Sequence, residues 1–361
     1  MTDEQKPAVA KLLEHEIGTL SATTAFGKTV VALYILAKRQ VNTLIVVHRR
    51  QLLDQWVERI EMFLNIPKKQ IGKIGGGKNK PTGIIDVAIM QSLTKNHEVD
   101  DVVANYGLVI FDECHHLSAS SFEKVANACK AKYVLGLSAT LTRKDGHHPI
   151  VFMQCGPIRY QVNAKNQAKK RPFDHLVHQR LTMFQMTDNS NHSIHEVYQA
   201  LILNKDRNDL IVSDIKKALA DGRIPIVLTE RKEHVEILAE QIAAFAKNIF
   251  VLQGGIGIRQ RKELINAINN LPENEERIII ATGKYLGEGF DDARLDTLFL
   301  VMPVSWKGTL SQYVGRLHRL HHAKSEVVIY DYVDSLVPML DKMSEKRRIG
   351  YKSLGYTIQD I

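Results

Sequence analysis

The feature that most constrains the fold is a series of short, continuous apolar runs that each end in polar residues. The first set lies at residues 42–48, 84–90, 106–113 and 132–140. A second set lies at residues 224–230, 248–254, 276–282, 295–303 and 325–333. Strands that are buried on both faces of a parallel sheet have this composition. Helical stretches separate the runs, as in residues 50–64, where apolar residues recur at helical spacing. The pattern predicts an α/β protein with functional groups at the carboxyl ends of its strands.

A polar, basic stretch separates the two sets of runs. It covers residues 163–180 and contains a Lys-Lys-Arg-Pro sequence. At 361 residues the chain is long enough for two domains with separate cores. We therefore expect a first domain at residues 1–157, a basic linker at 158–200 and a second domain at 201–361.

The composition limits the partners and the compartment. Lysine and arginine outnumber acidic residues by 48 to 40, which favours a polyanionic partner such as nucleic acid, although many basic proteins bind none. Three cysteines without a CxxC pair indicate neither a disulfide framework nor a cysteine zinc site. The chain has no apolar run of membrane-spanning length and no secretory signal pattern. We expect a cytoplasmic protein with no membrane partner, associated with the nucleoid or nucleus if DNA is bound.

A Gly-Lys-Thr sequence at residues 27–29 precedes a helical stretch. A glycine turn at a helix start exposes backbone N–H groups that hold phosphates. Lys28 would add positive charge at the β- and γ-phosphates, and the Thr29 hydroxyl would ligate Mg²⁺. The standard pattern GxxxxGK[ST] has glycine where this chain has Ala22. Alone, the segment fits either a nucleotide site or a helix start that carries Gly-Lys-Thr by chance.

Two adjacent carboxylates, Asp112 and Glu113, follow the apolar residues 108–111. A strand end is where phosphate hydrolysis needs one acid to hold Mg²⁺ and another to activate water. Adjacent acids are common in loops, so this signal is weak by itself. With Lys28 upstream, the two acids complete a Walker A and Walker B pair. The combination predicts ATP and Mg²⁺ as cofactors, with Thr29 and Asp112 as the metal ligands.

Five segments in order resemble the motifs of superfamily 2 helicases. Motifs I, II, III, V and VI correspond to ATTAFGKT (22–29), FDECHH (111–116), LSAT (137–140), ATGKYLGEGFD (281–291) and QYVGRLHR (312–319). Motif I of that family reads AxTGxGKT, and Ala25 departs from it. His115 places the chain with the DExH proteins. Residues 136–146 and 155–162 resemble helicases of the xeroderma pigmentosum group B type and related bacterial helicases, although Lys144 stands where an acidic residue is usual.

The resemblance implies two tandem RecA-like domains, each a mainly parallel sheet flanked by helices, with ATP in the cleft between them. The catalytic residues it implies are Lys28, Asp112, Glu113, Gln312, Arg316 and Arg319. Those for the nucleotide are Gln5, Thr24, Ala25, Phe26, Gly27, Lys28, Thr29, Gly289 and Asp291. Those that couple the ATP site to nucleic acid are His115, Ser138, Thr140, Arg143 and Asp145. The segment at 312–319 reads as a helix, on which Arg316 and Arg319 would share a face as arginine fingers.

Nucleic-acid contacts are expected from polar or small residues that follow strands. The candidates are His48, Arg49, Gln91, Ser92, Thr229, Arg231, Gly254 and Thr282. Such groups would contact phosphates and read no sequence.

The resemblance implies an ATP-dependent helicase or translocase that moves 3′ to 5′ on DNA. A DExH RNA helicase stays open, because residues that track the backbone do not identify the sugar. An ATP-gated clamp or recruitment module of a repair or defence assembly also stays open. Further domains or subunits outside this chain are expected in each case.

Overall fold

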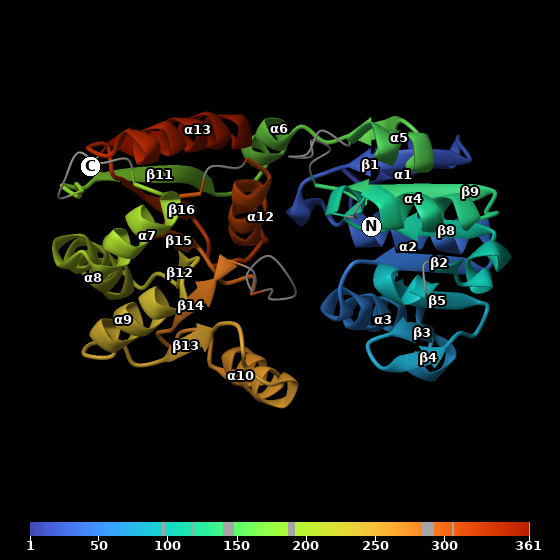
Figure 1. Ribbon diagram of the computed structural model, residues 1–361, viewed down its shortest axis with the longest axis horizontal. Coiled ribbons are helices and arrows are strands. Elements are labelled where there is room, and N and C mark those ends of the chain that lie inside the picture. Colours follow the sequence, from blue (N-terminus) through green and yellow to red (C-terminus); the bar gives the residue numbers. More distant parts are fainter. Residues whose placement is uncertain are drawn as a thin grey trace. The chain divides into compact units, whose positions relative to one another are not determined.

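The computed structural model of the chain describes residues 1–95, 98–116, 119–139, 148–186, 192–283, 292–304 and 307–360. The chain divides into two compact units, Met1–Asn163 and Ala164–Ile361. Each unit is built on one sheet with helices on both faces (Figure 1). No helix in these described ranges combines the length and apolarity that a membrane crossing needs.

The sheet of unit 1 has the strand order β10-β1-β9-β8-β2-β5-β3-β4. All neighbours are parallel except β3 and β4, which form an antiparallel hairpin at one edge. The strands are β1 (Ile17–Ser21), β2 (Thr43–Val47), β3 (Gly72–Gly75), β4 (Lys78–Lys80), β5 (Ile85–Ile89), β8 (Leu108–Phe111), β9 (Tyr133–Ser138) and β10 (Ile158–Gln161). A separate small hairpin joins β6 (Thr94–Lys95) and β7 (Glu98–Val99).

Helices cover both faces of this sheet because its strands carry apolar residues on both faces. In β2, Ile45 and Val47 pack into one core, and Leu44 and Val46 pack into the other. The first core is covered by α1 (Lys6–Leu13), α2 (Lys28–Arg39) and α3 (Arg50–Leu64). The second is covered by α4 (Ala119–Ala128), α5 (His148–Cys155), η3 (Met90–Leu93) and η4 (Asp101–Asn105). The remaining short helices are η1 (Thr24–Phe26), η2 (Lys68–Gln70) and η5 (Cys114–His116).

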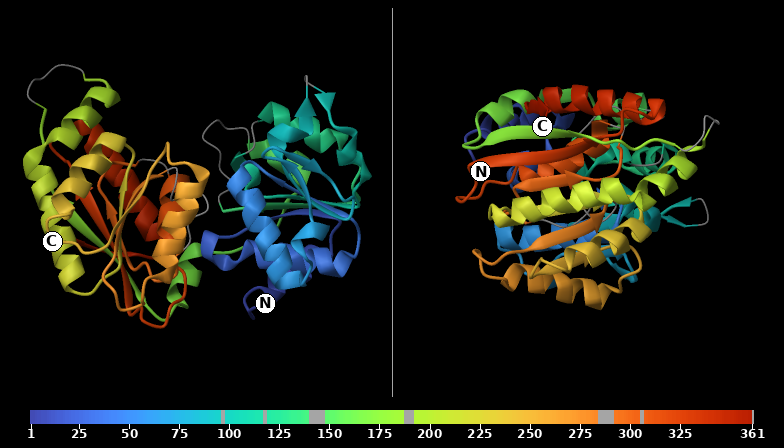
Figure 2. Two further views of the ribbon diagram at one scale, coloured as in Figure 1. Left: turned by 90° about the horizontal axis from the view of Figure 1, so that it is seen from below. Right: turned by 90° about the vertical axis from the view of Figure 1, so that its left-hand side faces the viewer.

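The sheet of unit 2 is parallel throughout, with the order β13-β14-β12-β15-β16-β11-β17. Its strands are β11 (Asp174–Leu181), β12 (Pro225–Thr229), β13 (Ile249–Leu252), β14 (Ile278–Thr282), β15 (Thr297–Leu300), β16 (Glu326–Val333) and β17 (Thr357–Asp360). One face is covered by α8 (Lys205–Ala220) and α9 (Lys232–Ile242). The other is covered by α10 (Ile258–Asn270), α12 (Lys307–Leu317) and α13 (Pro338–Leu354) (Figure 2). In the part of unit 2 that the structure describes, the remaining helices are α6 (Ala164–Lys169) and α7 (Ile194–Leu203).

Every predicted apolar run contains a strand, and the predicted helix at 50–64 is α3. The stretch 158–200, expected to be a linker, instead contains two strands of the sheets. Residues 158–161 form β10 beside β1, and residues 174–181 form β11 between β16 and β17. Only alternate residues of β11 are buried, so its sequence has the polarity of a linker. The two units meet at residues 163 and 164, within the expected linker.

Candidate nucleotide-binding and catalytic site

The loop after β1 has the geometry of a phosphate-binding turn. Gly27 precedes α2 with φ +84° and ψ 42°, a left-handed conformation that glycine adopts at little cost. A Cβ at Gly27 would lie 2.5 Å from Gln5 Nε2. Between β1 and α2, Gly27 alone has a positive φ. Ala22 and Ala25 therefore fit where family patterns carry glycine, and the N–H groups at the start of α2 remain aimed at this loop.

Lys28 connects the loop to the end of β8. Its side chain is 7% exposed, and Nζ donates to the Ala22 carbonyl at 3.2 Å. Nζ also lies 3.1 Å from Glu113 Oε1. The structure thus brings together the ammonium and the carboxylate of two segments 85 positions apart in the sequence.

Asp112 is buried directly after β8. The indole Nε1 of Trp56 donates to its Oδ2 at 2.7 Å, and the Glu113 amide donates to its Oδ1 at 3.0 Å. Burial raises the pKa of this carboxyl, and the nearby Glu113 charge raises it further, whereas Trp56 and Lys28 act in the opposite direction. The indole hydrogen bond was missed by sequence reasoning, because a tryptophan in an amphipathic helix reads as a core residue.

Glu113 has a positive φ of +46°. A non-glycine residue in this region costs about 1–3 kcal/mol, and such conformations cluster at functional sites. The conformation directs the carboxylate to three neighbours. Besides Lys28, the Ala139 amide donates to Oε2 at 3.3 Å, and His115 Nδ1 lies 3.4 Å from Oε2.

His115 joins the ends of β8 and β9. A hydrogen bond of 2.8 Å connects its Nδ1 to Ser138 Oγ, and both residues are buried. Two of the expected coupling residues are therefore in contact, next to Glu113. The other three, Thr140, Arg143 and Asp145, lie outside the described residues.

The two expected Mg²⁺ ligands have suitable chemistry. Thr29 offers a hydroxyl and Asp112 a carboxylate, both oxygen donors of the kind that Mg²⁺ prefers. The Thr29 hydroxyl accepts a hydrogen bond of 2.8 Å from Arg59 Nη1 of α3. Thr29 and Asp112 thus each accept a hydrogen bond from a side chain of α3.

Gln5 supports the loop. Its Nε2 donates to the Phe26 carbonyl at 2.8 Å, and its Oε1 accepts from the Thr2 amide at 2.9 Å. Thr24, Ala25 and Phe26 form η1 immediately before Gly27. Gln5 therefore contacts the loop segment that contains the other expected nucleotide residues of unit 1.

The expected nucleic-acid residues in unit 1 follow strands in different settings. His48 follows β2, and burial lowers its pKa, while the charges of Glu113 and Asp112 oppose the shift. His48 is therefore close to Asp112 and Glu113. Gln91 and Ser92 are exposed in η3 after β5. Arg49 is the residue before α3.

Thr229 in unit 2 does not fit its expected role as a nucleic-acid contact. The residue is fully buried, and its hydroxyl bonds His234 Nδ1 at 3.1 Å and accepts from the Arg231 amide at 3.3 Å. It connects the end of β12 to His234 in the first turn of α9. A threonine after an apolar strand can either face a ligand or bond to buried neighbours, and only the burial distinguishes these roles.

The other candidates in unit 2 are more varied. Arg231 Nη2 donates to His195 Nδ1 at 3.1 Å, on the surface. Gly254 lies in the turn after β13 and is partly exposed. Thr282 ends β14 and is 8% exposed. Gly289 and Asp291 lie outside the described residues.

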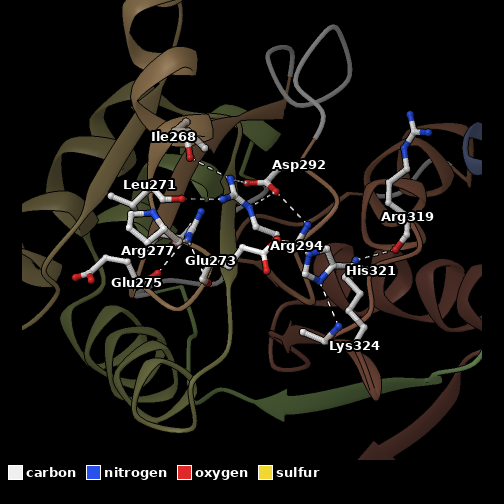
Figure 3. Close-up of polar contacts among 12 residues, drawn as sticks. Ile268, Leu271, Glu273, Glu275, Arg277, Asp292, Arg294, Arg319, His321 and Lys324 are labelled. Atoms are coloured by element: carbon white, nitrogen blue, oxygen red, sulfur yellow. Dashed lines mark hydrogen bonds and ion pairs between the residues drawn. The ribbon is translucent and has the colours of Figure 1, made fainter.

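The arginines of the last motif do not share a helix face. α12 ends at Leu317, so Arg316 is helical and Arg319 lies in the turn that follows. Lys324 Nζ donates to the carbonyls of Leu317 and Arg319 at 2.9 and 3.0 Å and so closes the helix end. Figure 3 shows the Arg319 guanidinium pointing away from the neighbouring Asp292–Arg294 cluster. Gln312, one of the expected catalytic residues, lies within α12 and is partly buried.

A contact that the sequence did not reveal joins α12 to the end of β12. The Tyr313 hydroxyl donates to Glu230 Oε1 at 2.9 Å. Burial, followed by the Glu230 charge, raises the pKa of Tyr313. A Cβ at Gly283 would clash with both the hydroxyl and the carboxylate. The approach of α12 to this strand end therefore requires glycine at 283.

One group of possible metal ligands occurs in the described residues of unit 2. The ligand atoms of Glu273, His321 and His322 all lie within 4.8 Å of one another. The side chains of Glu273 and His322 are 60% and 75% exposed. Glu273 also interacts with the positive charges of Arg277 and Arg294, which would oppose a cation. Glu273 is better explained as the acidic partner of these basic side chains.

Known proteins resemble the chain in sequence. The family model "Type III restriction enzyme, res subunit" matches residues 1–143. A candidate ATP-dependent RNA helicase of Acanthamoeba polyphaga mimivirus is 29% identical over 352 residues, covering 95% of this chain and 65% of that protein. The DNA 3′-5′ translocase XPB2 of Sulfurisphaera tokodaii is 36% identical over 170 residues, covering 47% and 37%. The chain thus spans less than two thirds of the length of either relative.

Two solved structures share the fold over essentially the whole chain. The ATP-dependent Type ISP restriction-modification enzyme LlaBIII bound to DNA has a TM-score of 0.69 at 15% identity, covering 100% of this chain and 31% of that one. S. cerevisiae Dbp5 bound to RNA and ADP·BeF3 has a TM-score of 0.67 at 14% identity, covering 99% and 90%. The chain is thus similar in sequence to proteins named as helicases and translocases, and it shares its fold of two parallel-sheet units with these solved structures.

Proposed function

We propose that the chain is an ATP-driven motor, a helicase or translocase that couples ATP hydrolysis to movement along nucleic acid. The observation that carries the proposal is the meeting of Lys28 and Glu113, with Nζ and Oε1 3.1 Å apart at the end of the phosphate loop. Phosphoryl transfer needs a cation at the phosphates and a base for the attacking water in this neighbourhood.

ATP would supply the phosphoryl group, and Mg²⁺ held by Thr29 and Asp112 would supply neutralising charge at the phosphates. The N–H groups at Gly27 and the start of α2 bind the phosphates. Lys28 moves its ammonium from Glu113 to the γ-phosphate. Glu113 Oε1 then accepts the proton of the attacking water, while His115 holds the other side of that carboxylate.

Unit 2 contributes the remaining charges in the proposal. Arg316 and Arg319 neutralise the departing γ-phosphate, Gln312 senses it, and Gly289 and Asp291 bind the ribose or couple the units. In the proposal, ATP binding and hydrolysis change how the two units grip nucleic acid. The resemblance of the last two motifs supports these roles.

We propose DNA as the track and 3′ to 5′ as the direction. The printed name of the archaeal relative, a DNA 3′-5′ translocase, favours this choice. The mimivirus relative, a candidate RNA helicase, favours RNA as the second candidate. The net charge of +8 suits either polymer. The chain would work with further domains or subunits, in the cytoplasm or at a nucleoid or nucleus.

The test is ATP hydrolysis by the purified chain alone, with single-stranded DNA, with duplex DNA and with RNA of equal length. Glu113→Gln protein serves as the blank. We expect DNA to raise the turnover number above the basal value. If only RNA raises the turnover number, the track is RNA and not DNA. If the chain binds ATP but hydrolyses it under none of these conditions, the motor proposal is wrong and an ATP-gated clamp is favoured.

A further inference from the structure

Helix α3 reaches both proposed Mg²⁺ ligands with residues one turn apart. Trp56 donates from Nε1 to Asp112 Oδ2 at 2.7 Å, and Arg59 donates from Nη1 to Thr29 Oγ1 at 2.8 Å. Residues three apart lie on the same face of a helix. One helix face therefore holds an oxygen ligand from the phosphate loop and another from the end of β8.

The Trp56 side chain is held by core packing. The residue is 1% exposed and packs in the core with Leu53, Val57 and Ile60 of the same helix. An indole N–H can only donate, so it favours the ionised acceptor, and it lowers the pKa of Asp112 against the effect of burial. The packing fixes the indole ring, and the indole in turn fixes one carboxylate oxygen.

The Arg59 contact is compatible with a metal on the same hydroxyl. A threonine hydroxyl has one proton and two acceptor lone pairs. Accepting from Arg59 uses one lone pair and leaves the other for a cation. The hydrogen bond thereby orients the hydroxyl without occupying it fully.

We infer that α3 positions the Mg²⁺ site, with Trp56 orienting Asp112 and Arg59 orienting Thr29. This inference rests on the proposed ATPase function and assigns both residues as positioning residues. The groups behind metal ligands set metal affinity, and their loss typically weakens it 10–100-fold. In this inference, α3 sets the affinity for Mg²⁺ by orienting Asp112 and Thr29.

Trp56→Phe is the deciding variant because it keeps an aromatic ring in the core and removes the N–H donor, with no change of charge. The readout is Mg²⁺ affinity, measured by titrating Mg²⁺ into protein with a fluorescent non-hydrolysable ATP analogue. We expect the half-saturating Mg²⁺ concentration to rise at least about 10-fold. Binding of the analogue in EDTA should match the parent.

Ile60→Val is the matched control, since it changes the same buried helix face and touches neither ligand. It should keep the parental Mg²⁺ affinity. Circular dichroism melts of both variants establish that they fold. If Trp56→Phe folds and its Mg²⁺ affinity stays within twofold of the parent, the inference is wrong. It is equally wrong if Ile60→Val weakens Mg²⁺ binding as much as Trp56→Phe does.

Arg59→Lys tests the second contact at constant charge, because removing the positive charge would itself favour a cation. A lysine has a single ammonium in place of the planar fork. We expect Mg²⁺ affinity to fall in Arg59→Lys and to fall further when it is combined with Trp56→Phe. An affinity equal to the parent would remove Arg59 from the inference. A parent protein that binds no nucleotide at all would instead contradict the proposed function, so the two failures are distinguishable.

Discussion

Glu113 adopts a left-handed backbone conformation that a glutamate rarely takes, with φ +46°. Its carboxylate meets Lys28 on one oxygen and the Ala139 amide on the other. A cost of about 1–3 kcal/mol is tolerated only where surrounding contacts hold the residue. At the scale of single residues, the candidate base is therefore aimed by strain and by its neighbours together.

Glu113→Gln should retain ATP binding and lose turnover. The amide cannot accept a proton from water, and general bases contribute about 10²–10⁴-fold to rate. Phosphate release gives the turnover number, and binding of a fluorescent ATP analogue gives the affinity. Hydrolysis at the parental rate would mean that another group activates the water.

The buried imidazole of His234 predicts a pH dependence of stability. Thr229 and Asn208 hydrogen-bond its two ring nitrogens at 3.1 Å each, and burial lowers its pKa from 6.5 to about 3. As the pH falls below about 6.5, the unfolded chain binds a proton that the folded chain does not, so the free energy of unfolding decreases. The loss attributable to this group is about 2 kcal/mol at pH 5.

Urea unfolding of the parent and of His234→Gln between pH 7.5 and 5 measures this contribution. The variant should show a shallower loss of stability than the parent as the pH falls. Because the buried carboxyls are common to both proteins, the difference between the two profiles isolates His234. Parallel profiles would contradict the assignment.

At the scale of elements, the parallel strands place the functional residues. The ends of β1, β8 and β9 bring the phosphate loop, the two acids and Ser138 to one edge of the first sheet. In unit 2, α12 approaches the end of β12 through Tyr313 and Glu230. The orientation of Gln312 and Arg316 depends on that approach.

Gly283→Ala should displace α12 while the unit stays folded. The added Cβ has no room beside the Tyr313 hydroxyl and the Glu230 carboxylate. A shift of about 1 Å at a catalytic group costs about 10²-fold in rate, so the turnover number should fall steeply and ATP affinity little. Adding Tyr313→Phe removes the hydroxyl and should restore part of the rate. An unaffected Gly283→Ala protein would show that α12 is placed by other contacts.

At the scale of the whole molecule, the proposal divides catalysis between two units. Unit 1 carries the phosphate loop and the acids, and unit 2 carries the arginines. A charge supplied by a second domain acts mainly in the transition state, and arginine fingers contribute about 10³–10⁵-fold to rate.

Arg319→Ala should therefore lower the turnover number by a large factor and change ATP affinity little. Arg316→Ala, within α12, is the parallel variant. Steady-state hydrolysis with and without DNA measures both. Parental turnover in Arg319→Ala would assign the finger to Arg316, and parental turnover in both would remove α12 from the catalytic role.

The amino-acid sequence by itself determined the two α/β units, the strands and the candidate ATP site. Strands buried on both faces leave continuous apolar runs, and the chemistry of phosphate binding demands Gly-Lys-Thr and paired acids in local segments. The half-buried strand β11 was not predicted, because its burial alternates and its overall sequence is as polar as that of a linker.

Only the tertiary structure decided which polar residues face each other. It buried Thr229 against His234, placed Arg319 beyond the end of α12, and brought Trp56 to Asp112. These outcomes depend on packing between segments distant in the sequence, where one side chain's role is set by the neighbours it meets. Local sequence does not predict those neighbours, because burial and strand register arise only when the sheet and its helices are assembled.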